Sequence, residues 1–286
     1  MPKTVNDLYL EFRKTLKEAG VSGATLEAKE ICAYACDQDK HQIAGWAYVY
    51  LTQETEDKAR ALLQRRLDQE PLAYLIHEWD FYGLTFEITP DVLIPRSDTE
   101  PLCELAIQKA NQIVNPRVLD LCCGSGCIGI AIAKHAHPVR VVAVDISTGA
   151  LTVARRNAFH HKLSESCYVA AQGDARKPYD GRLGEFHILV CNPPYITQNE
   201  MRELDLSVRD YEPELALYGG IDGLDFYRSI CENWKSALLT GGEIMFECGW
   251  RQGEQVAAIL EENGYGEIAL HADLSGVQRI VTGKKM

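Results

Sequence analysis

Apolar segments with strand spacing and helix spacing alternate along the second half of this chain, and this alternation constrains the fold more than any other feature. Runs typical of buried strands occur at residues 118–121, 140–145, 168–171, 187–191 and 243–247, and helical spacing occurs at 128–133, 148–159, 225–239 and 253–263. A closing pair of strands is expected near 268–271 and 279–281. The pattern predicts an α/β fold with a parallel, doubly wound sheet. Such sheets bind ligands at the carboxyl ends of their strands, so the residues after each strand are candidate site residues.

The first 75 residues differ in character, because their apolar residues follow helical spacing. Thr4 and Asp7 predict a capping box at the start of a helix that ends at Gly20. Two further helices are predicted within residues 25–35 and 55–69. No pattern in this region indicates catalysis, so it either packs only on itself or binds a partner protein.

A short segment rich in aromatic and β-branched residues separates these two regions. It covers residues 76–94 and predicts a β-hairpin linker. The predicted organisation is a helical domain over residues 1–75, this linker, and the α/β domain over 95–286. Ser97 or Asp98 is expected to cap the first helix of the α/β domain.

Composition excludes several classes of protein. The 286 residues are 46% hydrophobic, which is typical of a globular protein, and the net charge of −12 disfavours non-specific binding to nucleic acid. The amino terminus has no apolar signal region and no stretch is long enough to span a bilayer, so the protein is expected in the cytoplasm. The ten cysteines are then reduced thiols. Cys122, Cys123 and Cys127 share one loop without a second group at ligand spacing, so no metal site is predicted.

A glycine loop follows the first predicted strand of the α/β domain. Gly124, Gly126 and Gly129 satisfy GxGxxG before a helix, and Asp145 ends the next strand about twenty residues further on. In nicotinamide enzymes and in S-adenosylmethionine enzymes alike, such a loop approaches the cofactor with its backbone and such an acid holds ribose hydroxyls. The motif alone does not separate the two.

Two later strand ends favour S-adenosylmethionine. Asp174 follows the third strand, where a carboxylate can accept a hydrogen bond from an adenine amino group, although a plain turn after Gly173 is an alternative reading. The fourth strand ends in Asn192-Pro193-Pro194-Tyr195. No His or Lys is placed to serve a hydride transfer.

The Asn192-Pro193-Pro194-Tyr195 sequence predicts a clamp for a planar NH₂ group. The prolines fix the backbone and lack N–H donors, which leaves backbone carbonyls free, and the Asn192 side chain adds a further carbonyl acceptor. Tyr195 supplies a flat wall with a polar tip. Two acceptors can hold both hydrogens of a carboxamide or of an amino-purine and direct its nitrogen toward an electrophile. These four residues are the predicted catalytic and substrate-binding residues.

With these motifs the chain resembles the bacterial release-factor glutamine N5-methyltransferases, the HemK/PrmC family, over nearly its whole length. The segments that carry the resemblance are residues 71–74, 93–100, 119–126, 192–195, 212–213, 216–217 and 219–225, together with Arg279. The 192–195 sequence also occurs in adenine-N6 DNA methyltransferases and some RNA enzymes. The segments 93–100 and 219–225 make the match specific.

The resemblance implies a fold, a reaction and a set of site residues. The fold would be a five-helix-like, substrate-binding domain, a hairpin linker and a Rossmann-like class I methyltransferase domain. The reaction would move a methyl group from S-adenosylmethionine to the Gln side-chain amide of Gly-Gly-Gln in peptide-chain release factors 1 and 2. The implied cofactor-binding residues are Cys122, Cys123, Gly124, Ser125 and Gly126 for the methionine part, Asp145 for the ribose, Asp174 and Ala175 for the adenine, and Asn192. A monomer is expected, without membrane or direct nucleic-acid contact.

Other functions are compatible with these motifs. They are methylation of a ribosomal-protein glutamine, methylation of an exocyclic amino group of DNA or RNA, and non-enzymatic binding of S-adenosylmethionine. The chain also departs from the resembled family: Gly is common where His77 stands, Pro where Ser97 stands, and an aromatic residue near Ala175.

Overall fold

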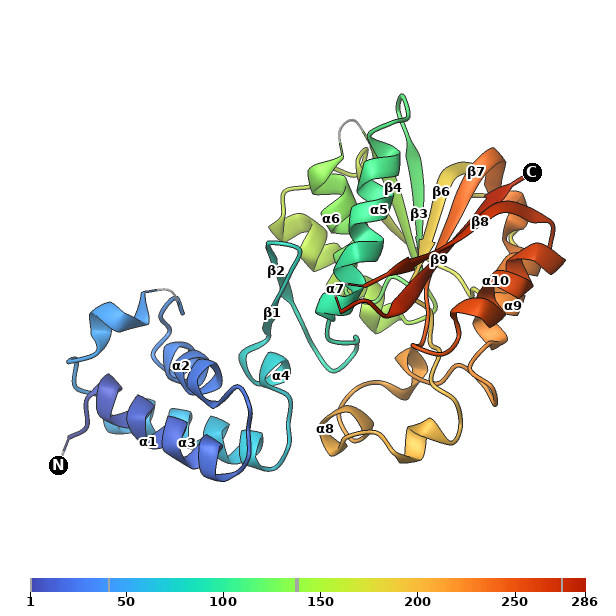
Figure 1. Cartoon of the computed structure of the whole chain (residues 1–286). Coiled ribbons are helices and arrows are strands. Elements are labelled where there is room, and N and C mark those ends of the chain that lie inside the picture. Colours follow the sequence, from blue (N-terminus) through green and yellow to red (C-terminus); the bar gives the residue numbers. More distant parts are fainter. Residues whose placement is uncertain (1, 41, 137–138, 274) are drawn as a thin grey trace. The chain divides into compact units, whose positions relative to one another are not determined.

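The computed structural model describes residues 2–40, 42–136, 139–273 and 275–286 (Figure 1). The chain forms two compact units. The first comprises residues 1–78 with 206–211, and the second comprises residues 79–205 with 212–286.

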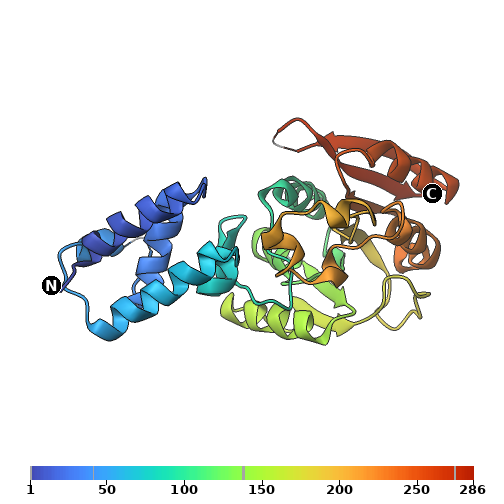
Figure 2. The same ribbon diagram turned by 90° about the horizontal axis from the view of Figure 1, so that it is seen from below.

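Helices build the first unit, and α1, α2 and α3 lie side by side in Figure 1, while Figure 2 shows the same helices from below. They are α1 (Val5–Glu18), α2 (Ala24–Ala35), a 3-10 turn (Ile43–Trp46), α3 (Gln53–Leu67), α4 (Leu72–Ile76) and α8 (Leu206–Arg209). The predicted capping box is confirmed: the Asp7 N–H donates to the Thr4 hydroxyl at 3.1 Å, and the Thr4 N–H donates to the Asp7 carboxylate at 2.9 Å. The same helix buries Leu8, Phe12 and Leu16, which stack at helical spacing.

Two features of the first unit concern its boundaries. His77 ends α4 with a φ of 59°, a left-handed conformation that glycine adopts without strain, which explains why Gly suits this position. Residues 206–211 pack with this unit although they lie far along the chain, and the Tyr211 hydroxyl donates to the Asp68 carbonyl at 2.9 Å. The sequence motifs do not indicate that second contribution.

The second unit holds the predicted sheet. A small hairpin of β1 (Glu78–Phe81) and β2 (Leu84–Glu87) precedes seven strands: β3 (Arg117–Leu121), β4 (Arg140–Asp145), β5 (Tyr168–Gln172), β6 (Phe186–Cys191), β7 (Leu238–Glu247), β8 (Tyr265–Ala272) and β9 (Gln278–Lys285). Their order is β5-β4-β3-β6-β7-β9-β8. The first five in this order are parallel, as the alternation predicted, and the closing pair of strands is antiparallel, a direction that was not predicted.

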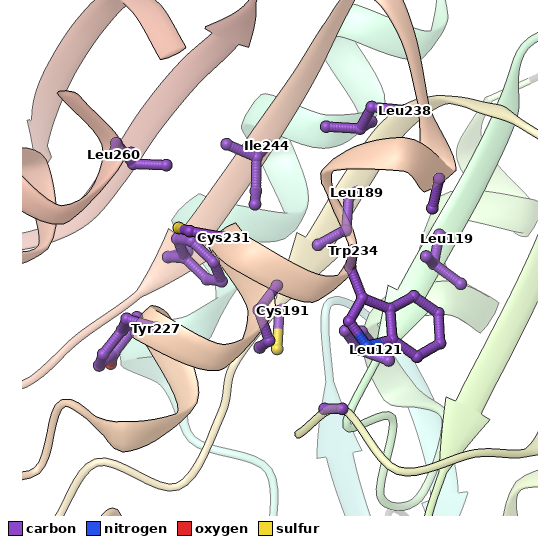
Figure 3. Packing of buried hydrophobic residues seen from close by; sticks show 14 of the residues in the cluster. Leu119, Leu121, Leu189, Cys191, Tyr227, Cys231, Trp234, Leu238, Ile244 and Leu260 are labelled. Carbon is purple, nitrogen blue, oxygen red and sulfur yellow. The ribbon is translucent and has the colours of Figure 1, made fainter. Parts of the chain in front are cut away.

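Helices cover both faces of this sheet. They are α5 (Glu100–Ala110), α6 (Cys127–His135), α7 (Thr148–His160), α9 (Asp225–Asn233) and α10 (Gly253–Glu262), with 3-10 turns at Ser97–Thr99, Glu200–Arg202, Glu214–Ala216 and Lys235–Ala237. Side chains of α9 and α10 form a core with every second residue of the central strands, such as Leu119 and Leu121 of β3 (Figure 3). α5, α6 and α7 pack beside one another and against β3 to β7.

Two local predictions were wrong. The helix expected to reach residue 239 ends at Asn233, and β7 already begins at Leu238, because Gly241 and Gly242 form an irregularity within the strand rather than a turn before it. Neither Ser97 nor Asp98 caps α5: both lie in a 3-10 turn, and the helix starts at Glu100 without a side-chain cap.

Candidate active site

The carboxyl ends of β3, β4, β5 and β6 open into one pocket of about 210 Å³, which lies within the second unit. The predicted site residues that line it are Cys122, Gly124, Asp145, Asp174, Ala175, Asn192 and Pro194. The topology brings them together because neighbouring parallel strands end at the same edge of the sheet.

The glycine loop is fixed to the end of β4 by hydrogen bonds. Asp145 accepts from the Gly124 N–H at 2.9 Å through one carboxylate oxygen and from the Ser147 N–H at 2.9 Å through the other. Burial raises the pKa of Asp145, and these N–H donors partly oppose that shift. The φ of Gly124 is 53°, so a residue without a side chain is favoured where the backbone borders the pocket.

Other residues of the loop, Cys123, Ser125 and Gly126, are buried and do not line the pocket. A Cβ atom on Gly126 would lie 2.6 Å from the Tyr168 hydroxyl, so only glycine fits there. The Ser125 carbonyl accepts from the Asn157 amide at 3.0 Å. Asn157 also pairs with the backbone of Glu87, at 2.7 Å and 3.0 Å, and thereby joins the hairpin to the loop. Asn157 was not predicted, because a single Asn within a helix carries no signal.

At the end of the third strand, β5, no aromatic residue adjoins Asp174 in the sequence. Asp174 accepts from the Arg176 N–H at 2.9 Å, and Ala175 is buried in the core. Phe226 of α9 lines the same pocket, with the Arg176 guanidinium 5.5 Å from the centre of its ring. An aromatic wall is therefore present, supplied by a residue that is distant in the sequence.

Asn192 lies between the pocket and a buried hydroxyl. It lines the pocket, and its amide nitrogen donates to the Thr99 hydroxyl at 3.2 Å. This bond directs the amide nitrogen of Asn192 toward Thr99, and the other end of the carboxamide is a carbonyl oxygen that can only accept. Thr99 belongs to the segment 93–100, one of the two segments that make the family resemblance specific.

The backbone after Asn192 is held on both sides. Pro193 and Pro194 are buried, and the Tyr195 carbonyl accepts from the Gln252 amide at 3.0 Å. Burial raises the pKa of the Tyr195 hydroxyl, which keeps it neutral. Neither Pro193 nor Tyr195 lines the pocket. Gln252 was not among the predicted residues.

The glycine-rich run 219–225 packs against this backbone. A Cβ on Gly219 would lie 2.6 Å from the Pro194 carbonyl oxygen, and one on Gly223 would lie 2.3 Å from the Tyr195 carbonyl oxygen. The run therefore needs glycine for close approach between two segments of backbone.

A buried carboxylate anchors the segment 93–100. Glu212 accepts from the Ile94 N–H at 3.2 Å and pairs with the Arg96 guanidinium. Pro213, which follows Glu212 directly, lines the pocket. These contacts explain why two segments more than a hundred residues apart both carry the family resemblance.

Comparisons with known proteins agree with this arrangement. Residues 7–76 match the model of the PrmC N-terminal domain, and residues 102–207 match that of the methyltransferase small domain. In the described ranges no helix has both the length and the apolar character needed to cross a bilayer. No group of three or more metal-ligating side chains was found in those ranges either.

Individual relatives cover almost the whole chain. The release factor glutamine methyltransferase of Geobacter sulfurreducens is 38% identical over 95% of this chain and 93% of its own length. The release factor glutamine methyltransferase of Thermodesulfovibrio yellowstonii is 35% identical over 91% of this chain and 92% of its own length. The hMettl16 catalytic domain, solved with a MAT2A 3′UTR hairpin, is 15% identical with a TM-score of 0.55 over 81% of this chain and 82% of that one, which shows a shared fold. The chain therefore belongs to the release factor glutamine methyltransferase family.

Proposed function

We propose that this protein transfers a methyl group from S-adenosylmethionine to the side-chain amide nitrogen of the glutamine in the Gly-Gly-Gln motif of peptide-chain release factors 1 and 2. The observation that carries the proposal is the position of Asn192, which lines a pocket together with Asp145 and Asp174 while its amide nitrogen donates to Thr99. Membership of the family supports the choice of substrate.

The pocket has the chemistry that S-adenosylmethionine requires. Asp145 offers a carboxylate for ribose hydroxyls, and Asp174 offers an acceptor for an adenine amino group beside the ring of Phe226. Gly124 brings bare backbone to the pocket where the methionine part would lie, near Cys122. Cys123, Ser125 and Gly126 would support this set from behind the lining, since all three are buried, and Ala175 would border the adenine as part of the lining. When bound, the cofactor supplies a methyl group on a positively charged sulfur, which is a strong electrophile.

The chain's own part in the reaction is to hold and orient a poor nucleophile. An amide nitrogen is unreactive because its lone pair is delocalised into the carbonyl. The Asn192 side-chain oxygen and the Pro193 carbonyl would accept its two hydrogens, which favours a pyramidal nitrogen with an available lone pair. Pro194 and Tyr195 would complete the wall of this clamp. Loss of a proton can follow alkylation, when the nitrogen has become acidic, so orientation is the main contribution.

The proposal extends to the rest of the chain. The helical region of residues 1–75 would bind the release factor, with residues 76–94 as the linker and residues 95–286 as the methyltransferase domain. The match of residues 7–76 to the PrmC N-terminal domain supports this division of roles. The protein would act as a monomer in the cytoplasm, where the release factors are made and used.

Labelled S-adenosylmethionine tests the proposal directly. The purified protein is incubated with each release factor, with a release factor that carries Gln→Ala in Gly-Gly-Gln, with ribosomal proteins and with DNA and RNA. Label should enter the unmodified release factors only, and mass spectrometry should place one methyl group on the Gly-Gly-Gln glutamine. Equal labelling of the Gln→Ala protein, or labelling of a ribosomal protein or nucleic acid instead, would refute the proposed substrate.

A further inference from the structure

Glu247 is a buried carboxyl group that the site as described above does not use. It ends β7, directly after Phe246, which pairs with Cys191 in the neighbouring strand β6, so Glu247 and Asn192 leave the sheet side by side. Glu247 is 1% exposed and does not line the pocket. A charge is rarely placed so deep without a role that an uncharged residue cannot fill.

The groups around Glu247 include the hydroxyl of Thr99 and the amide of Asn192. Hydrogen bonds from both favour the ionised form, while burial acts more strongly and raises the pKa of Glu247 to about 7. One carboxylate oxygen, Oε2, is buried and has no hydrogen-bond partner among the described residues. The carboxyl group therefore keeps unused capacity to accept a hydrogen bond.

The other charged groups near Glu247 are engaged elsewhere. Arg279 of β9 favours the ionised form of Glu247, but its guanidinium pairs with Asp273 at 2.8 Å and with Asp98 at 3.6 Å. Asp98 opposes ionisation of Glu247. Tyr195 and Cys248 also face Glu247, and burial raises the pKa of both, so they stay neutral near pH 7.

We propose that Glu247 is a positioning residue, which acts with Thr99 to hold the Asn192 carboxamide with its nitrogen inward and its oxygen toward the substrate. An ionised carboxylate only accepts hydrogen bonds, so the Thr99 hydroxyl must donate to it. The Thr99 oxygen is then free to accept from the Asn192 nitrogen, as observed at 3.2 Å. The inference rests on the proposed function, because it assigns an orientation to the clamp for the glutamine amide.

Protonation would reverse this chain of hydrogen bonds. A neutral carboxyl group carries an O–H donor that can bond to the Thr99 oxygen, and the Thr99 hydroxyl can then donate to Asn192. Asn192 would satisfy that donor by turning its oxygen inward and its NH₂ toward the pocket. The clamp would then present donors to the two hydrogens of the substrate amide, and methyl transfer would stop.

Glu247→Gln tests this directly, because it preserves size but removes the charge and replaces one acceptor oxygen with an NH₂ donor. We expect kcat for release-factor methylation to fall about 10- to 100-fold, with KM for both substrates within about twofold, since only the orientation of one group changes. Glu243→Gln is the matched control: it lies on the same strand, pairs with Lys109, and should leave kcat unchanged. Thermal unfolding and cofactor affinity are measured for each variant.

The pH profile separates positioning from a structural role. With saturating substrates, kcat of the wild-type protein should rise with pH and level off above about 7, because the ionised form is the competent one. The inflection should be absent in Glu247→Gln. Carbon-13 NMR of labelled Glu side chains should show one carboxyl titrating near that pH in the wild-type protein, and the signal should disappear in the variant.

Thr99 supplies a second test that does not require substitution of a buried charge. Thr99→Ser keeps the hydroxyl and should retain most of kcat, whereas Thr99→Val keeps the shape, removes the hydroxyl and should lose activity as Glu247→Gln does. Equal activity of the Ser and Val variants would overturn the proposal. Wild-type-like kcat in a folded Glu247→Gln protein, or persistence of its pH inflection, would do the same. Failure of the wild-type protein to methylate any release factor would instead refute the proposed function.

Discussion

At the scale of single residues, the site depends on a few polar groups whose orientation is set from behind. The Thr99 hydroxyl accepts from the Asn192 nitrogen, and backbone N–H groups hold both oxygens of Asp145. Such preorganisation means that no group has to be reoriented when charge develops.

Asn192→Ala should lower kcat by about two to three orders of magnitude, because it removes one preorganised acceptor from the clamp. Cofactor affinity should change much less, since the rest of the pocket is intact. The assay is steady-state methylation of a release factor, with Asn199→Ala as the control, because Asn199 is the same residue type at an exposed position. Near wild-type turnover in Asn192→Ala would contradict the assignment.

Phe226→Ala should weaken binding of S-adenosylmethionine by about tenfold, as expected when an aromatic wall of a pocket is removed. Phe159→Ala serves for comparison, because this side chain is 85% exposed and lies far along α7 from the pocket-lining residues. Isothermal titration calorimetry measures both affinities. An unchanged affinity in Phe226→Ala would mean that the adenine lies elsewhere.

At the scale of elements, the run 219–225 acts as a spacer between the clamp and α9. Its glycines allow its backbone to approach the backbone of Pro194 and Tyr195 more closely than any side chain would permit. The amide of Gln252, which lies after β7, donates to the Tyr195 carbonyl as well. The clamp is therefore fixed by packing on two sides as well as by its own prolines.

Gly223→Ala should displace this packing, because its Cβ would lie 2.3 Å from the Tyr195 carbonyl oxygen and its φ is +75°. We expect kcat to fall at least about tenfold, since a small misplacement of a clamp is costly in rate. Gly241→Ala shares the positive φ of +79° but has room for a Cβ, so it reports the backbone strain alone. If both variants lose kcat to the same degree, close approach to Tyr195 is not the cause.

At the scale of the whole molecule, two buried carboxyl groups of the second unit connect its stability to pH. Burial raises the pKa of Asp120 and of Glu247 to about 7 each. In the unfolded chain such groups titrate near about 4, so between these values the folded state binds more protons. The free energy of unfolding should therefore fall as pH rises from about 4 to 7, and then level off.

Asp120→Asn should remove part of that slope. The contribution of Asp120 is about 4 kcal/mol at most, on a scale of about 1.4 kcal/mol per pKa unit. Urea unfolding at pH 5, 6, 7 and 8 measures it, with exposed Asp205→Asn as the control. The same slope in Asp120→Asn and in the wild-type protein would show that Asp120 is already ionised in the fold at low pH.

Much of this description was accessible from the sequence. The order and type of the main elements followed from apolar spacing, because each strand or helix must bury one face. Asp145, Asp174 and Asn192 could be named as candidate site residues because each lies at or just beyond the carboxyl end of a strand, and parallel strands end together. Thr4 and Asp7 defined a helix start because a capping box needs only neighbours in the chain.

Other features were decided only by tertiary structure. The sequence by itself determines which chemistry a residue type can perform and at which end of a strand the residue lies. Phe226 on the pocket wall, Asn157 beneath the glycine loop, Glu247 beside Asn192 and residues 206–211 in the first unit were not predictable in this way. Each depends on contacts between segments far apart in the chain, and such contacts follow from how whole elements pack rather than from any short pattern.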